Sequence, residues 1–205
     1  MKSVYFQIGT NDGNDLFRDI VLKNKPDIII LVEPNKDLYN DILKNYNNIS
    51  NVYIYTNAIY YNDNEEVELF IPTWGNHGHA HFSLLPMNDW GNINNMKKIK
   101  SKSITFDKIC NNHNITNIDY LQIDTEGFDS EIIQMIDLSK YKIKTIRFEK
   151  WNFKTECFSV YHKEKSNKLG EAGMKLCIDK LKKNNYQIRN IQDQMGNDFL
   201  ATLIE

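Results

Sequence analysis

The stretch SVYFQIGTNDG, residues 3–13, decides the fold class. Its first part, Ser3 to Ile8, is rich in β-branched and aromatic side chains, which predicts a strand. Gly9 and Gly13 then predict a loop in which the backbone can turn sharply. Apolar residues recur at amphipathic spacing after the loop and predict a helix from about Asn14 to Lys23. A strand, a glycine-containing loop and a helix in this order are typical of the start of a parallel α/β sheet.

The rest of the chain repeats this alternation of strands and helices. Ile28–Val32 is an unbroken apolar run, as expected of a central strand that is buried on both faces. The last two predicted strands, Tyr186–Ile191 and Asp198–Ile204, are too close in sequence for a crossover helix, so they must pair antiparallel. The remaining predicted elements are strands at 52–55, 67–71, 119–123 and 144–148 and helices starting near 34 and at 104–111, 130–136 and 170–183. The prediction is a single α/β domain over residues 1–205, with a mostly parallel sheet and an antiparallel C-terminal hairpin.

Composition and charge narrow the class of protein. The 205 residues include 25 Lys and Arg against 27 Asp and Glu, a formal net charge of -2. This balance gives no electrostatic reason to expect binding to nucleic acid or to an anionic membrane. Three cysteines are too few for a disulfide framework and suit a reducing compartment. Without a signal-peptide pattern or an apolar run near the roughly 20 residues of a membrane span, we expect a soluble, cytoplasmic protein.

The loops that follow the first three strands have the chemistry of a nucleoside site. Ligands of open α/β sheets bind at the carboxyl ends of the strands. Glu33 follows the second strand, where its carboxylate can accept hydrogen bonds from a ribose diol. Asn57 and Ala58 follow the third strand, where an amide and a backbone N–H can bind an adenine edge. The cofactor-binding residues expected in the first loop are Gly9, Thr10, Asn11, Asp12 and Gly13.

The charge of the first loop discriminates between cofactors. A dinucleotide fingerprint needs G-x-G-x-x-G, whereas this loop has an acidic residue, Asp12, where a pyrophosphate would approach. A carboxylate repels a diphosphate but attracts the ammonium and sulfonium groups of S-adenosylmethionine (SAM). The loop therefore favours SAM over NAD.

Further carboxylates follow two later strands. Asp124 and Glu126 come directly after the strand 119–123, and Glu149 follows the strand 144–148. We expect Asp124 and Glu126 to bind the cofactor, and Asp124 or Glu149 to act as a general base. Asp129 and Ser130 come shortly after Glu126, at the expected start of a helix. For these two residues, capping of that helix is the simpler interpretation.

The segment Pro72–Lys102 lacks periodicity and is rich in Gly, His, Asn and Trp. Irregular segments of this length in a compact domain are commonly functional, so we expect a lid-like insertion over the acceptor site. His79 and His81 within it are further candidates for the general base. No Cys or carboxylate lies near them in sequence, so no metal site is predicted.

Taken in order, several segments resemble the FkbM family of SAM-dependent methyltransferases. The matching segments, which reach from the N-terminus to about residue 152, are VYFQIGTNDGNDLF, LVEPNKDLY, TNAIYYNDNEEVELF, HFSLL, SITFDKI, IDYLQIDTEGFDSEII and IRFEKWN. The combination of the IGxNDG loop, VEP and IDxEG carries the specificity of this resemblance. One departure is Gln7, where many methyltransferases have an acid that helps to hold the methionine end of SAM. The resemblance leaves Asp12 or Asp124 to fill that role.

The resemblance implies a Rossmann-like, seven-stranded SAM-dependent methyltransferase fold and O-methylation of sugar or polyketide hydroxyls. We therefore expect transfer of a methyl group from SAM to a hydroxyl of a carbohydrate or glycan precursor. Two alternatives remain open at this point: methylation of another small-molecule hydroxyl, such as that of a polyketide or lipid, and a non-catalytic nucleoside-binding module. The expected partner is a small-molecule or glycan acceptor, and nothing in the sequence sets the oligomeric state.

Overall fold

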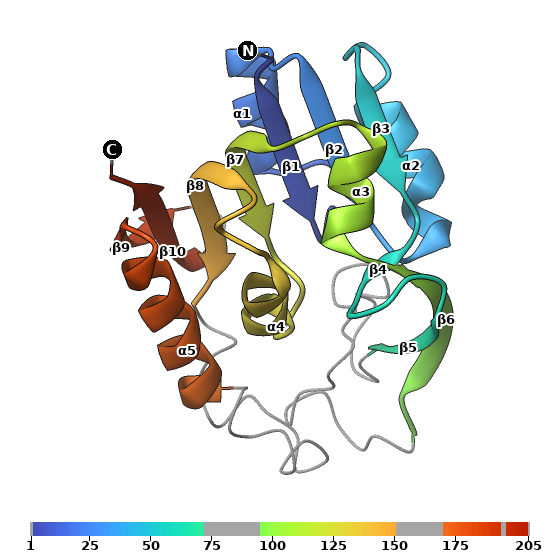
Figure 1. Ribbon diagram of the computed structural model, residues 1–205. Helices are drawn as coiled ribbons and strands as arrows, with labels where there is room; N and C mark the ends of the chain where they lie inside the picture. Colours follow the sequence, from blue (N-terminus) through green and yellow to red (C-terminus); the bar gives the residue numbers. More distant parts are fainter. Residues whose placement is uncertain (1, 72–94, 151–169, 194–195, 205) are drawn as a thin grey trace.

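The computed structural model describes residues 2–71, 95–150, 170–193 and 196–204. Seven strands form one sheet in the order β3-β2-β1-β7-β8-β10-β9 (Figure 1). They are β1 (Val4–Ile8), β2 (Ile28–Val32), β3 (Val52–Tyr55), β7 (Asn117–Ile123), β8 (Lys142–Glu149), β9 (Tyr186–Asp193) and β10 (Gly196–Leu203). Neighbouring strands are parallel except at β10, which runs antiparallel to β8 and to β9. The mostly parallel sheet and the antiparallel C-terminal hairpin are confirmed.

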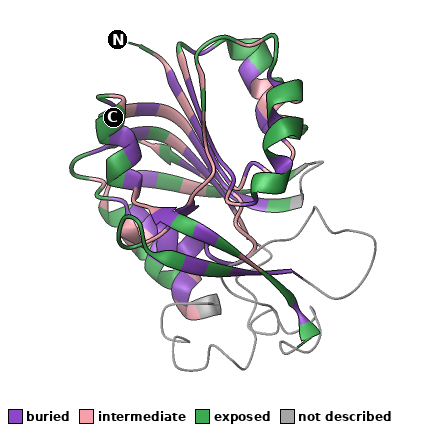
Figure 2. Ribbon diagram, turned by 90° about the vertical axis from the view of Figure 1, so that its right-hand side faces the viewer, coloured by how far each residue is buried: buried purple, intermediate pink, exposed green. Residues whose placement is uncertain are grey.

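Helices cover both faces of this sheet (Figure 1). Alternate residues of β2 supply the two cores, because side chains along a strand point to opposite faces. Ile29 and Leu31 pack with Phe17, whereas Ile30 and Val32 belong to the larger core. The helices that pack on the smaller core are α1 (Leu16–Asn24) and α2 (Tyr39–Asn45), and the short 3-10 helix η1 (Lys36–Leu38) directly precedes α2. The helices that pack on the larger core are α3 (Phe106–Asn112), α4 (Asp129–Met135) and α5 (Gly170–Lys183). Figure 2 shows the buried residues concentrated along the strands between these layers.

A second, three-stranded sheet lies at the carboxyl end of the parallel strands. Its strands are β4 (Ala58–Ile59), β5 (Glu66–Ile71) and β6 (Lys97–Ile104), in the order β4-β6-β5. The prediction that Pro72–Lys102 is irregular is therefore wrong for its last part, Lys97–Lys102. Residues 72–94, including His79 and His81, lie outside the described residues, so the remainder of the lid stays a prediction.

The physical reason for this error is the chemistry of β6. Its buried face carries Ser101 and Ser103, so the strand lacks the alternation of apolar and polar residues by which strands are found. Its exposed lysines pair across the strand with glutamates of β5. The Nζ of Lys100 lies 2.6 Å from Glu66 Oε1. The same extension of β6 shifts the next helix, because Ile104 ends the strand and α3 begins at Phe106.

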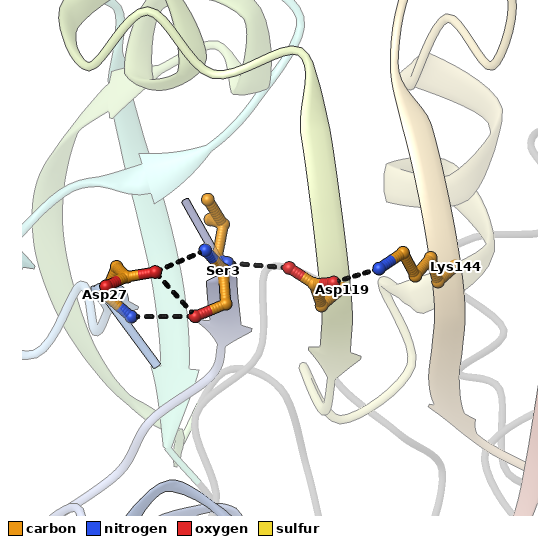
Figure 3. A network of polar contacts seen from close by, with 5 residues as sticks. Ser3, Asp27, Asp119 and Lys144 are labelled. Carbon is orange, nitrogen blue, oxygen red and sulfur yellow. Dashed lines mark hydrogen bonds and ion pairs between the residues drawn. The ribbon is translucent and has the colours of Figure 1, made fainter. Parts of the chain in front are cut away.

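A network of polar contacts at the opposite end of the sheet attaches β1 to its neighbours (Figure 3). The backbone N–H and hydroxyl of Ser3 donate to Asp27 Oδ2 over 2.7 and 3.0 Å. The N–H of Val4 donates to Asp119 Oδ2 at 2.9 Å, and Lys144 Nζ donates to Asp119 Oδ1 at 2.5 Å. Asp119 therefore connects β1, β7 and β8.

No helix in the described ranges is long and apolar enough to cross a membrane.

Replacement of Asp119 tests the contribution of this network. We expect Asp119→Ala to lower the free energy of unfolding by about 1–2 kcal/mol, because it removes the acceptor of a part-buried backbone N–H. Urea unfolding measures the change, and Asp41→Ala, at an exposed position of α2, is the control. Equal stability of the two variants would contradict the role of Asp119.

Candidate functional site

A cleft opens where β1, β2 and β7 end. Its lining residues come from the loops after these strands, from the second sheet and from α4: Ile8, Gly9, Asn11, Val32, Glu33, Pro34, Ala58, Ile59, Leu69, Asp124, Thr125, Glu126, Phe128 and Ile132. The cleft thus brings together six of the residues predicted from sequence, namely Gly9, Asn11, Glu33, Ala58, Asp124 and Glu126. One wall is apolar, and the charged lining residues that the structure describes are all acidic.

Close packing of two loops forms the floor of this cleft. The N–H of Gly9 donates to the carbonyl of Val32 at 2.9 Å, and the N–H of Asp124 donates to that of Ile8 at 2.9 Å. Gly9 has φ +83°, and a β-carbon there would lie 1.7 Å from the carbonyl oxygen of Asp124. Only glycine fits at this position, because both the backbone conformation and the space exclude a side chain.

Glu33 is buried and holds two loops with its carboxylate. Oε2 accepts the N–H of Asn11 and Oε1 accepts the N–H of Asn35, both at 2.8 Å. Burial raises the pKa of Glu33 to about 7, although these two hydrogen bonds oppose the rise. Each carboxylate oxygen has a second lone pair, so Glu33 can still accept hydrogen bonds from a ligand in the cleft.

The other predicted residues of the first loop do not line the cleft. Asp12 Oδ1 accepts the N–H of Asn14 at 2.9 Å, which places this side chain at the entry to α1. Gly13 has φ +75° and packs against the ring of Tyr46. Thr10 is buried, and within the described part of the chain its hydroxyl has no hydrogen-bond partner.

Two further amide side chains have structural partners. Gln7, which replaces the acid of many methyltransferases, is fully buried and donates to Asp15 Oδ2 at 2.5 Å. Asp15 in turn caps α1 by accepting the N–H of Arg18. Asn57 lies beside the cleft-lining Ala58, but its amide donates to the carbonyl of Lys102 at 3.2 Å.

Asp124 follows β7 and lines the cleft. Within the described residues its carboxylate accepts no hydrogen bond. Burial raises the pKa of Asp124 well above its usual range, and the charges of Glu126 and Asp129 raise it further. Positive φ angles at Glu126 and Gly127, +53° and +104°, turn the chain from β7 toward α4.

Asp129 is the first residue of α4, and the prediction that it caps this helix is wrong, because the N-cap residue is Phe128, without a side-chain cap hydrogen bond. Asp129 Oδ2 accepts the N–H and the hydroxyl of Thr125 at 3.1 and 2.7 Å, and its Oδ1 accepts the N–H of Glu149 at 3.3 Å. It therefore ties the loop after β7 to the end of β8. Burial raises the pKa of Asp129 to about 6.

Glu149 ends β8 and does not line the cleft, but it faces Asp198 across the antiparallel pair with β10. Asp198 forms a buried ion pair with Arg147, whose Nε lies 2.5 Å from Asp198 Oδ2. Burial raises the pKa of Glu149 to about 11, with further contributions from Asp124 and Glu126. Sequence reasoning did not find Arg147 or Asp198, because only the pairing of β8 with β10 brings them together.

Comparison with known proteins identifies the family. Residues 7–188 match the methyltransferase FkbM domain. The chain belongs to the FkbM family. The FkbM chain is accordingly a SAM-dependent methyltransferase, and its sheet is the Rossmann-like sheet of these enzymes. No protein of curated function matches it in sequence.

Solved structures that resemble this FkbM chain do so at low identity. The fibrillarin/Nop5p complex matches over 100% of this chain and 73% of that chain, with 10% identity and a TM-score of 0.50. M. capricolum TrmK bound to S-adenosyl-homocysteine matches over 98% of this chain and 60% of that chain, with 16% identity and a TM-score of 0.42. The precorrin-6y C5,15-methyltransferase from Geobacter metallireducens matches over 97% of this chain and 80% of that chain, with 12% identity and a TM-score of 0.44. At identities this low, the likeness to these structures concerns the fold and says nothing of the substrate.

The residues of the cleft fit SAM. The apolar side chains of Ile59 and Phe128 suit an adenine ring, Glu33 has lone pairs for ribose hydroxyls, and the carboxylate of Asp124 suits a cation. Among the described residues, no group of three or more His, Cys, Asp or Glu side chains is arranged to hold a metal ion.

The raised pKa of Glu33 predicts how stability depends on pH. A carboxyl group with a folded-state pKa of about 7 binds its proton more tightly in the folded chain than in the unfolded chain. Proton binding therefore stabilises the folded chain at low pH, and this stabilisation is lost as the pH rises toward 7. We expect the protein without cofactor to be more stable at about pH 5.5 than at about pH 8. Glu33→Gln should reduce this difference in urea unfolding. An identical pH dependence in both proteins would contradict the shifted pKa of Glu33.

Proposed function

We propose that this FkbM methyltransferase transfers a methyl group from SAM to a hydroxyl of a carbohydrate or glycan precursor. The observation that carries the proposal is the carboxylate of Asp124, which lines the cofactor cleft and accepts no hydrogen bond within the described residues. An alcohol becomes acidic only as its new bond forms, so a single positioned carboxylate suffices as base. A neutral acceptor is favoured because the charged side chains among the described lining residues are all carboxyl groups, and none is a Lys or Arg that would bind phosphate.

Each residue of the cleft has a distinct role in this proposal. Glu33 binds the ribose hydroxyls, and the backbone at Gly9 and Ala58 allows a close approach of the cofactor. Asp124 and Glu126 attract the positive methionine end. Bound SAM supplies a methyl group on a sulfonium sulfur, a cation that favours the charged form of a neighbouring carboxylate.

The proton of the acceptor hydroxyl goes to Asp124 in this scheme. Glu149 does not line the cleft, and burial together with the charges of Asp124 and Glu126 raises the pKa of its carboxyl group. Burial and the charges of Glu126 and Asp129 raise the pKa of Asp124 as well. Asp124 is the one of the two that lines the cleft, where a neighbouring sulfonium group would favour its charged form. His79 and His81 remain alternative bases if the lid covers the acceptor.

Cofactor binding tests the role of Glu33. Glu33→Ala should weaken the binding of S-adenosyl-homocysteine by about 1.5–3 kcal/mol, the scale of hydrogen bonds to a charged group. Isothermal titration calorimetry gives the affinity, with Asp41→Ala as a control at an exposed position. Unchanged affinity in a folded Glu33→Ala protein would remove Glu33 from the cofactor site.

Turnover tests the role of Asp124. Asp124→Asn should lower kcat by about 10²–10⁴-fold, because a general base acts in the transition state. The assay is transfer of a labelled methyl group from SAM to a panel of sugars and oligosaccharides, with cofactor affinity measured in parallel. Full turnover of Asp124→Asn would exclude Asp124 as the base, and labelling of polyketide or lipid hydroxyls instead of sugars would replace the acceptor class.

A further inference from the structure

A second concavity lies between α3 and α4, outside the cofactor cleft. Residues that line this α3–α4 groove include Tyr60, Tyr61, Asp107, Glu131, Gln134 and Met135. They come from the segment after β4, from the first turn of α3 and from one face of α4. The groove has a volume of about 620 Å³, within the range of about 300–1,000 Å³ that small-molecule sites occupy.

The α3–α4 groove and the cofactor cleft share a wall. The ring of Tyr60 stacks on that of Phe128, with centroids 6.0 Å apart and planes 18° apart, and Phe128 lines the cleft. Ile132 also lines the cleft, whereas its neighbour Glu131 lines the groove. Neighbouring residues in one turn of α4 therefore line the two spaces.

An unused hydrogen-bond donor belongs to this groove. Gln134 and Met135 lie three and four residues after Glu131, so all three residues fall on one side of α4. Within the described residues, the Nε2 of Gln134 is buried and has no hydrogen-bond partner. Such a donor costs free energy when it is left unpaired, and a ligand oxygen in the groove would satisfy it.

Tyr61 adds an accessible aromatic surface at the same place. Its residue surface is 45% exposed, although its ring meets that of Tyr60 edge-on at 5.0 Å. A tyrosine combines a flat apolar ring with a polar hydroxyl, which suits ligands that have both apolar faces and hydroxyl groups.

The charges of the groove exclude an anionic ligand. Asp107 and Glu131 are acidic, and among the described lining residues none is Lys or Arg. Asp107 already forms an ion pair with Lys140, at 2.6 Å between Nζ and Oδ2. A phosphate or sulfate group would therefore meet carboxylates, whereas neutral hydroxyls can donate to a carboxylate oxygen and accept from the amide of Gln134.

We infer that the α3–α4 groove binds neutral saccharide units of the acceptor, so that the acceptor is an oligosaccharide longer than the unit that is methylated. Sugar rings present an apolar C–H face to Tyr61 and hydroxyls to Gln134 and Glu131. The inference rests on the proposed function for the carbohydrate class, and it adds a second binding site outside the cofactor cleft.

Glycan binding without cofactor tests this inference. The full chain is applied to an array of neutral oligosaccharides that contains members of the same series from one to several units long. We expect retention of longer members and loss of about tenfold in affinity for Tyr61→Ala, since one lost stacking contact is worth roughly 1.4 kcal/mol. Gln134→Leu, which keeps the side-chain volume but removes the amide, should also weaken binding.

Matched controls separate the groove from the cofactor cleft. Tyr39→Ala removes another exposed tyrosine, 39% exposed on α2, and should leave glycan binding unchanged. All three variants should bind S-adenosyl-homocysteine with the affinity of the parent chain in calorimetry. Absence of binding to any neutral oligosaccharide, or equal binding by Tyr61→Ala and Tyr39→Ala, would overturn the groove assignment. Methyl transfer to single sugars with no oligosaccharide binding would retain the proposed function and reject the groove, whereas no transfer to any sugar would reject the proposed function itself.

Discussion

The close approach of Gly9 to the carbonyl of Asp124 is the constraint on which the site depends. A β-carbon at Gly9 would lie 1.7 Å from that oxygen, so the loops after β1 and β7 can meet only because the side chain is a hydrogen atom. Their contact sets the floor of the cleft and brings Asp124 next to the loop that Glu33 holds through the N–H of Asn11. A larger side chain at Gly9 would separate the loop after β1 from the loop after β7, and the residues of these two loops would not line one cleft.

A second property of the site follows from this crowding. Asp124 follows β7, Asp129 begins α4 and Glu149 ends β8, and each has a pKa raised mainly by burial. Buried carboxyl groups that repel one another are costly in the absence of a cation. A cofactor that carries a sulfonium and an ammonium group relieves this repulsion. Of the three, Asp124 lines the cleft, where the proposed function places the cationic end of SAM.

Much of the architecture could be predicted because local patterns carried it. The β-rich run before Gly9, the apolar run Ile28–Val32 and the short connection before the last strand led to the correct sheet class and to the hairpin. The strand β6 could not be found in the same way. Its inner face carries Ser101 and Ser103 instead of apolar side chains. The hydroxyl of Ser103 accepts the N–H of Glu65 and donates to the carbonyl of Asn62, both in the segment before β5. The lysines of β6 are balanced by glutamates on β5, which no local pattern reveals.

The sequence by itself determined the strand–loop–helix units, the family and the residues Glu33 and Asp124 at the carboxyl ends of buried strands, because strand order along the chain and the chemistry of the following loop are local properties. Only the tertiary structure decided which of those residues share a cleft. Asp12 and Asn57 have the expected chemistry, but their side chains bind neighbouring backbone instead of lining it. Asp198 and Arg147 pair only because β10 lies antiparallel to β8. The groove between α3 and α4 exists only because these two helices, which precede and follow β7, pack on the same face of the sheet. Such partners depend on distances in space, and these are set by the packing of the whole sheet.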